Sequence, residues 1–203
     1  MTYEENIQMR TIISRSLVYE GGFVDNKFDT GGMTYMGVSR KNFPNWDGWK
    51  KIDAILKKRR IKKGEIINDS ALTECVMKFY EQNFFKKIIG TLKITPETEP
   101  IIGLMLDYSI HSGNKAAIKK IQYCINKLNG KDVVVEDGIQ GPNTSKAIMS
   151  LNLSDLAAHY LEVRHQYLKA VAQKNQNHIF YTGWMNRLEK LARLYKIEKL
   201  SEW

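Results

Sequence analysis

The sequence predicts a mainly helical protein with a short β-hairpin or irregular loop after its first helix. Apolar residues recur at spacings of three and four over most of the chain, which is the period of an amphipathic helix. Residues 23–40 break this period, because Phe, Val, Tyr and Met are interspersed there with Gly, Asn, Asp and Thr, as in a hairpin or loop. Gly- and Pro-containing segments separate the other helical stretches.

The first helix is expected over residues 4–19, where apolar side chains line one face. Gly21 and Gly22 follow at once, and glycine is a common helix stop signal. Glu20 therefore lies at or just beyond the last turn. The helix dipole disfavours negative charge at that end, so an acid there is unusual.

A shorter helix is expected to begin within FPNWDGWKKIDAIL, residues 43–56. Asn68 or Asp69 can then cap a longer helix that continues to about residue 88. Apolar residues at helical spacing predict which side chains of this helix reach the core. They are Leu72, Val76, Phe79, Tyr80 and Phe84.

The best candidate for a domain boundary is GTLKITPETEP, residues 90–100, which combines Gly, two Pro and a change of pattern. We therefore expect a region 1–92 and a helical region 93–203, packed together as one compact unit. Pro142 suits the first turn of a helix. Helices of the second region are predicted near residues 98–111, 114–128, 142–150, 153–174 and 180–196.

Composition narrows the class of protein. Hydrophobic residues make up 43% and charged residues 26%, as in ordinary globular proteins, and no apolar run is long enough for membrane insertion. MTYEENIQMR lacks the basic and apolar pattern of a secretory signal, so we expect synthesis in the cytoplasm and, if the protein works outside it, another route of release. Cys75 and Cys124 fall in amphipathic segments and are expected to be core thiols; no metal or cofactor is expected.

The net charge is +9, and part of it is concentrated in KKRRIKK, residues 57–63. A basic surface attracts polyanions, which include nucleic acid, anionic lipid and the acidic polymers of a bacterial wall. No nucleic-acid-binding motif accompanies the charge, so nucleic acid is not the expected partner. A merely solvated loop remains an alternative.

Glu20 is the candidate general acid. Glycoside hydrolysis needs a carboxylic acid that is protonated near neutral pH, which requires a pKa above the usual value of about 4.3 for Glu. Burial or a nearby negative charge raises the pKa of a carboxyl group. Asp29 can hold a water or stabilise positive charge on the sugar, and Thr34 can orient that water. The alternative is a surface acid followed by ordinary turns.

Two Gly-Gly pairs flank Asp29, and they suggest that a polysaccharide passes close to the main chain. Aromatic residues nearby can stack on sugar rings, although aromatic side chains are more often part of the core. The candidate substrate-binding residues of this segment are Gly21, Gly22, Gly31, Gly32 and Tyr35, with Trp46 and Trp49 close to the expected cleft.

EGGFVDNKFDTGGMTYMGVS, residues 20–39, resembles the signature of glycoside hydrolase family 108, the lysozyme-like muramidases of phages and bacteria. That signature typically reads Glu-Gly-Gly-Tyr, an Asn/Asp-rich turn, Gly-Gly-Ala-Thr and Gly-Ile. Phe23, Met33 and Val38 are mild departures from it. The resemblance implies that Glu20 is catalytic. The spacing of Glu20 and Asp29 also resembles that of phage-type lysozymes, whereas Thr34 falls one residue short of the corresponding position.

The resemblance continues along the chain. DYSIHSGNKAAIKKIQ, residues 107–122, is similar to a second family segment, although His111 stands where Asn is usual. DGIQGPNTSKAI, residues 137–148, and FYTGWMNRL, residues 180–188, are similar to parts of the associated peptidoglycan-binding region. The far wall of the cleft is then expected to include Asp107, Ser109 and Asn114.

Together these likenesses imply a lysozyme-like helical bundle with a C-terminal helical peptidoglycan-binding region. The implied activity is cleavage of the β-1,4 bond between N-acetylmuramic acid and N-acetylglucosamine in bacterial peptidoglycan. We expect a monomer that reaches the wall through a holin or another export system, as a phage or prophage endolysin does. An inactive wall-binding or phage structural protein is the alternative.

Overall fold

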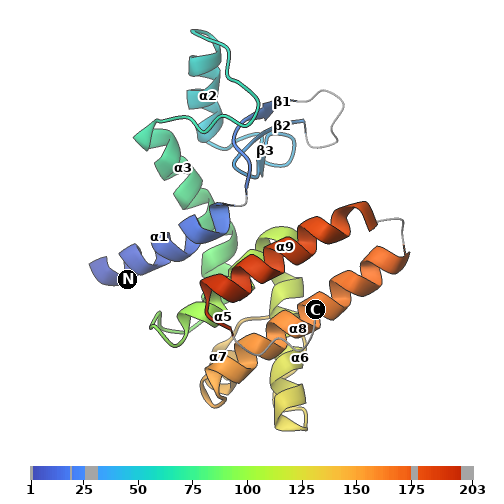
Figure 1. Ribbon diagram of the computed structural model, residues 1–203. Helices are drawn as coiled ribbons and strands as arrows, with labels where there is room; N and C mark the ends of the chain where they lie inside the picture. The colour runs from blue at the N-terminus through green and yellow to red at the C-terminus, as the bar shows by residue number, and fades with distance from the viewer. Residues whose placement is uncertain (1, 19, 26–31, 175–177, 198–203) are drawn as a thin grey trace. The chain divides into compact units, whose positions relative to one another are not determined.

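The computed structural model describes residues 2–18, 20–25, 32–174 and 178–197 (Figure 1). The chain divides into two compact units, an N-terminal unit Met1–Phe85 and a C-terminal unit Lys86–Trp203. Both are mainly helical, and a small antiparallel sheet follows the first helix, which confirms the predicted fold class. In the described part of the chain, no helix is long and apolar enough to cross a membrane. The predicted boundary at residues 92 and 93 stays a prediction, as does the packing of two regions as one unit.

Side-chain caps mark the starts of two helices of the N-terminal unit, the first helix and the helix that follows Asp69. Thr2 and Glu5 form a reciprocal capping box at the first helix. Asp69 accepts a hydrogen bond from the amide of Leu72 at 2.8 Å, which confirms one of the two predicted caps. The elements of this unit are α1 (Tyr3–Leu17), β1 (Val24–Asp25), β2 (Met33–Tyr35), β3 (Val38–Ser39), α2 (Gly48–Leu56), α3 (Ser70–Tyr80) and the π-helical turn η1 (Glu81–Phe85).

The sheet is an antiparallel meander in the order β1-β2-β3, in which Val24 and Ser39 both pair with Thr34. A two-residue turn, Met36 and Gly37, joins β2 to β3. Both residues have positive φ, 44° and 77°, as a type I′ turn requires. The predicted hairpin is therefore present.

Part of the core of the N-terminal unit lies between α1 and α3. α1 and α3 are in contact, and Ile12, Ile13 and Leu72 are completely buried there. Arg10 on α1 and Glu74 on α3 form a partly exposed ion pair with an Nη2–Oε2 distance of 2.8 Å. All but one of the core positions predicted for residues 72–84 are buried; Phe84 is half-buried.

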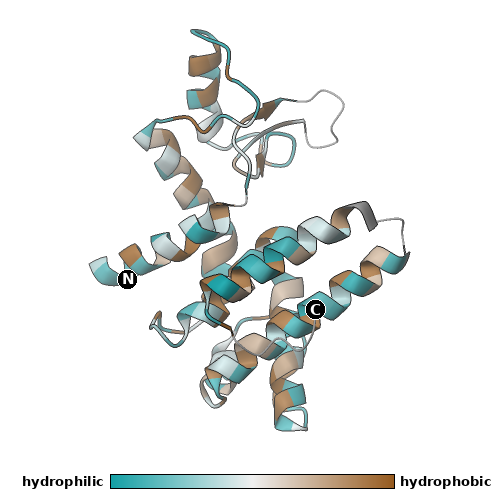
Figure 2. Ribbon diagram, in the orientation of Figure 1, coloured by the Kyte–Doolittle hydropathy of each residue, from teal (hydrophilic) through white to brown (hydrophobic). Residues whose placement is uncertain are grey.

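The C-terminal unit is built around one almost completely buried helix. Residues 101–109 of α5 (Glu99–Ser112) are all buried, and α5 contacts both α6 (Asn114–Asn129) and α8 (Leu153–Lys174). Hydrophobic and hydrophilic residues are mixed along α8 and α9, as expected of helices with one buried face (Figure 2). The remaining helices are α4 (Lys86–Ile89), α7 (Pro142–Met149) and α9 (His178–Leu194), and all five predicted helices are found within a few residues.

Candidate active site

Glu20 lies just after α1, in the segment that leads into the sheet. Its amide donates a hydrogen bond to the carbonyl of Leu17 at 2.9 Å, which continues the end of α1. The side chain is half-buried. Its carboxylate lies against the β2–β3 turn, because a Cβ atom at position 37 would be only 2.8 Å from Glu20 Oε2. Gly37 therefore leaves the space that this carboxylate occupies.

Tyr80 brings α3 to the same turn. Its ring is buried, and its hydroxyl donates a 2.7 Å hydrogen bond to the carbonyl of Met36. A Cβ atom at position 37 would also clash with this hydroxyl oxygen. Three segments distant in the sequence thus meet around the carboxylate of Glu20. The predicted core position of Tyr80 is confirmed, but the sequence did not predict that its hydroxyl reaches the site. A Tyr at a core position was the available signal, because a buried Tyr hydroxyl usually has a hydrogen-bond partner.

The two glycines after Glu20 have different environments. Gly21 is exposed, and no atom lies within 4 Å of where a Cβ would be. Gly22 is buried against the main chain of Gly64 and Glu65. Two backbone hydrogen bonds hold this contact: Phe23 N donates to Glu65 O at 2.9 Å, and Gly64 N donates to Phe23 O at 2.7 Å. Gly22 therefore leaves room for another stretch of this chain, and its predicted role beside a glycan stays a prediction.

The same contact brings the basic tract 57–63 to the segment that follows Glu20. Ile61 is buried and anchors the tract, while its basic side chains are exposed. Arg59 forms an ion pair with Glu65 at 2.6 Å, and this hydrogen bond lowers the pKa of Glu65. A positively charged loop is thus fixed close to the candidate acid in one unit.

The remaining candidates in the signature segment are less informative. Thr34 is a half-buried residue of the central strand. Tyr35 is only 2% exposed, and its hydroxyl accepts a hydrogen bond from Ile67 N at 3.1 Å. Burial raises the pKa of Tyr35 and gives the ring a packing role, and its predicted contact with sugar stays a prediction. Gly32 has a positive φ of 62°. Asp29 and Gly31 lie outside the described residues.

Asp107 and Ser109 are fully buried on α5 of the C-terminal unit, and their predicted contact with substrate stays a prediction. Asp107 forms ion pairs with Arg164 of α8 and, at 2.7 Å, with Arg187 of α9. Burial acts to raise the pKa of Asp107, but the two guanidinium charges outweigh it and hold the pKa below its usual range. This carboxylate joins three helices.

Asn114 and Asp137 belong to the C-terminal unit as well. Asn114 is the half-buried first residue of α6, and its predicted contact with substrate stays a prediction. Asp137 accepts hydrogen bonds at 2.8 Å from Gln122 Nε2 and from Ile139 N, which confirms that its segment forms a tight turn. Gly138, with φ of 79°, completes that turn.

Two family matches cover most of the chain. Residues 13–113 match the family described as Glycosyl hydrolase 108, and residues 116–189 match the family described as Predicted Peptidoglycan domain. The first match contains Glu20, Gly37 and Tyr80, which meet in the geometry described above. No curated protein matches the sequence significantly.

A solved structure of Brucella abortus SagA is similar to this one. The TM-score is 0.61 with 20% sequence identity, over 96% of this chain and 98% of that chain. At this level of identity the likeness shows a shared fold alone.

Proposed function

Since this chain is a glycosyl hydrolase of family 108 with a C-terminal predicted peptidoglycan domain, we propose that it is a muramidase of bacterial cell walls. The proposed bond is the β-1,4 linkage between N-acetylmuramic acid and N-acetylglucosamine in peptidoglycan. The observation that carries the proposal is the half-buried carboxylate of Glu20, seated against Gly37 inside the glycosyl hydrolase domain.

Glu20 is the proposed general acid. Cleavage of a glycosidic bond needs a positioned carboxylic acid that gives a proton to the leaving oxygen, and such catalysis is typically worth about 10²–10⁴ in rate. A rigid seat improves the position of the acid. The type I′ turn supplies this seat, because Tyr80 holds the carbonyl of Met36 and Gly37 leaves room for the carboxylate. Asp29 stays the proposed assisting carboxylate, and Thr34 the residue that orients water.

The basic tract 57–63 supports binding to the wall. Its exposed lysines are held near the candidate acid by the backbone contact between Phe23 and Glu65. Peptidoglycan carries carboxylates on its peptides, so a positive loop attracts this polymer over distances up to a Debye length. The C-terminal domain supplies the second proposed contact with the wall.

The test replaces Glu20 by Gln, which keeps the size of the side chain and removes its acidity. Turbidity of a suspension of purified peptidoglycan should stop falling, with a loss of activity of at least about 10²-fold. Glu4→Gln is the matched control, because Glu4 is an exposed acid in the first turn of α1. This control should lyse like the parent protein.

Mass analysis of the released fragments identifies the bond. Fragments with N-acetylmuramic acid at the reducing end support a muramidase, whereas anhydro ends would indicate a lytic transglycosylase. An active Glu20→Gln protein would refute the assignment of the acid. A parent protein that binds insoluble peptidoglycan without releasing reducing ends would instead favour an inactive wall-binding protein.

A further inference from the structure

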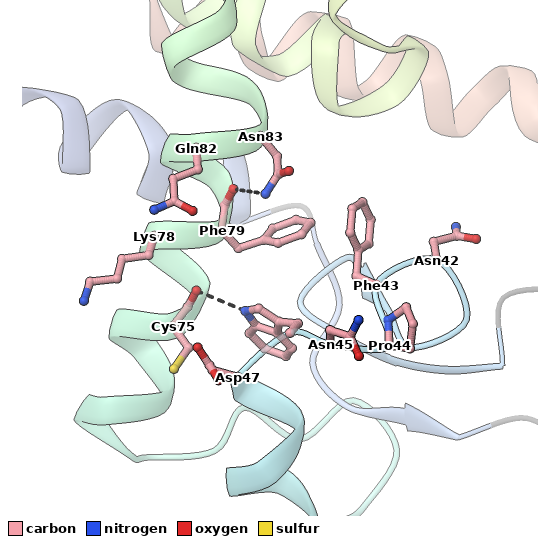
Figure 3. Close-up of a pocket in the computed structure, with 11 residues that line it drawn as sticks. Asn42, Phe43, Pro44, Asn45, Asp47, Cys75, Lys78, Phe79, Gln82 and Asn83 are labelled. Atoms are coloured by element: carbon pink, nitrogen blue, oxygen red, sulfur yellow. Dashed lines mark hydrogen bonds between the residues drawn. The ribbon is translucent and has the colours of Figure 1, made fainter.

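The N-terminal unit contains a pocket of about 530 Å³ that does not include Glu20 or the sheet (Figure 3). It lies between the start of α2 with its preceding loop and one face of α3 and η1. Its volume is within the range of small-molecule sites, which are usually about 300–1,000 Å³. The side chains that form it are those of residues 42–47 and of Cys75, Lys78, Phe79, Gln82 and Asn83.

Aromatic rings form the wall of this pocket. Phe43 and Phe79 meet edge to face with their centroids 4.7 Å apart, and Trp46 packs against Phe79 at 6.3 Å. The indole Nε1 of Trp46 donates to the carbonyl of Cys75 at 3.2 Å, which fixes the ring (Figure 3). Phe43 remains 37% exposed, so it offers apolar surface to a ligand.

The rim is polar and carries no net charge. The amides of Asn42, Asn45 and Gln82 are exposed, and an amide can both donate and accept hydrogen bonds. Asp47 and Lys78 are the charged groups of the lining and have opposite signs; Asp47 also forms an exposed ion pair with Lys50, outside the lining, at 3.2 Å. In a chain with a net charge of +9, a neutral pocket is poorly suited to an anionic ligand such as a free stem peptide.

We propose that this pocket binds a neutral N-acetylated sugar of the glycan strand. The C–H face of a pyranose packs on an aromatic ring, and the acetamido group matches the side-chain amides of the rim. The inference rests on the proposed function for its choice of polymer. It adds a glycan-binding site that does not include Glu20 but adjoins its surroundings through neighbouring residues of α3, since Phe79 lines the pocket and the hydroxyl of Tyr80 lies beside Gly37.

Cys75 makes the pocket directly observable. It lines the pocket and is half-buried, whereas Cys124 is fully buried and burial raises the pKa of Cys124 to about 12. A maleimide should therefore label the native protein at Cys75 alone, because the thiolate is the reactive form. Bound sugar should shield this thiol.

The experiment measures maleimide labelling of the full Glu20→Gln chain with saturating chitotetraose, a neutral polymer of N-acetylglucosamine. We expect labelling to slow at least fivefold. Cellotetraose, the matched ligand without acetamido groups, should give no protection at the same concentration. Gln82→Ala and Phe43→Ala should weaken binding about threefold to tenfold, and Tyr3→Ala, which removes an 85% exposed ring of the same unit, should not.

Several results would overturn the proposal: no protection by chitotetraose, equal protection by cellotetraose, or protection by a free stem peptide alone. Gln82→Ala changes an exposed side chain, so a loss of binding in that variant does not depend on misfolding. The proposed function is tested by a separate experiment, the lysis assay. A Glu20→Gln protein that still clears peptidoglycan would refute the catalytic assignment, while the Cys75 result would still decide on the pocket.

Discussion

The two glycines after Glu20 provide the sharpest test of the structure, because it predicts opposite outcomes for the same chemical change. A Cβ at position 22 would lie 2.5 Å from Gly64 O and 2.6 Å from Glu65 C, and both are main-chain atoms that cannot rotate away. A Cβ at position 21 would meet nothing within 4 Å. Gly22→Ala should therefore be strongly destabilising and Gly21→Ala should not.

The magnitude follows from the contacts at position 22. Forcing a methyl group into a packed site typically costs about 1–3 kcal/mol. The shift also weakens the two backbone hydrogen bonds between Phe23 and residues 64–65, each worth about 1 kcal/mol net. We expect a total loss of about 2–4 kcal/mol in the free energy of unfolding, which lowers the Tm of a domain of this size by at least about 8 °C. Gly21→Ala should stay within about 1 kcal/mol of the parent.

Calorimetry and denaturant unfolding measure both variants, and lysis of purified peptidoglycan measures activity. Gly22→Ala should also lose activity below its Tm, since the segment that positions Glu20 is displaced. Equal stability of the two variants would refute the packing of residues 64–65 on Gly22. A stable but inactive Gly21→Ala protein would point instead to contact between Gly21 and the glycan.

Other predictions concern the two ion-pair sites and the thiols. Arg187→Ala leaves Asp107 buried with a single partner and should cost about 3–5 kcal/mol in denaturant unfolding, whereas Arg10→Ala removes a partly exposed pair and should cost less than about 1 kcal/mol. The pKa of Asp107 is lower in the folded state than its value of about 3.9 in the unfolded chain. The stabilisation that its ion pairs give is therefore fully present above the unfolded-state pKa and is lost as the pH falls through the folded-state pKa. Stability measured from pH 7 to pH 2 should fall at the acid end, and less steeply in Asp107→Asn. Thiol titration should find one reactive group in the native protein and two after denaturation; fast reaction of Cys124 would contradict its burial.

The helices could be predicted because their signals are local. An amphipathic period marked α6 to α9, and Asp69 indicated the start of α3 through a cap that spans only three residues. The end of α1 and the hairpin were marked by glycines in the same way. What stayed hidden was the interruption of the helix after Tyr80 by a π-helical turn, since nothing in the local pattern distinguishes it from an α-helical turn.

The contacts that could not be predicted are those whose partners are distant in the sequence. From the local sequence, Asp107 is expected to be a polar residue of a cleft, because Arg164 and Arg187, which compensate its buried charge, are 57 and 80 residues away. Tyr35 is expected from the local sequence to stack on a sugar ring, because the amide that donates a hydrogen bond to its hydroxyl belongs to Ile67, 32 residues away. A buried polar group needs a partner, but the local sequence does not say whether that partner is protein or ligand.

The site of Glu20 combines both situations. Its acid, glycines and hairpin are local and could be found, yet the carboxylate is positioned by Gly37 and the turn by Tyr80, which lies 44 residues from Met36. Met36 has a positive φ, which is unfavourable for a side chain of this kind, so the turn depends on the hydrogen bond that Tyr80 gives to its carbonyl. The stability of the seat therefore comes from α3, outside the signature segment. A search restricted to residues 20–39 finds the proposed acid but not the contact that holds it.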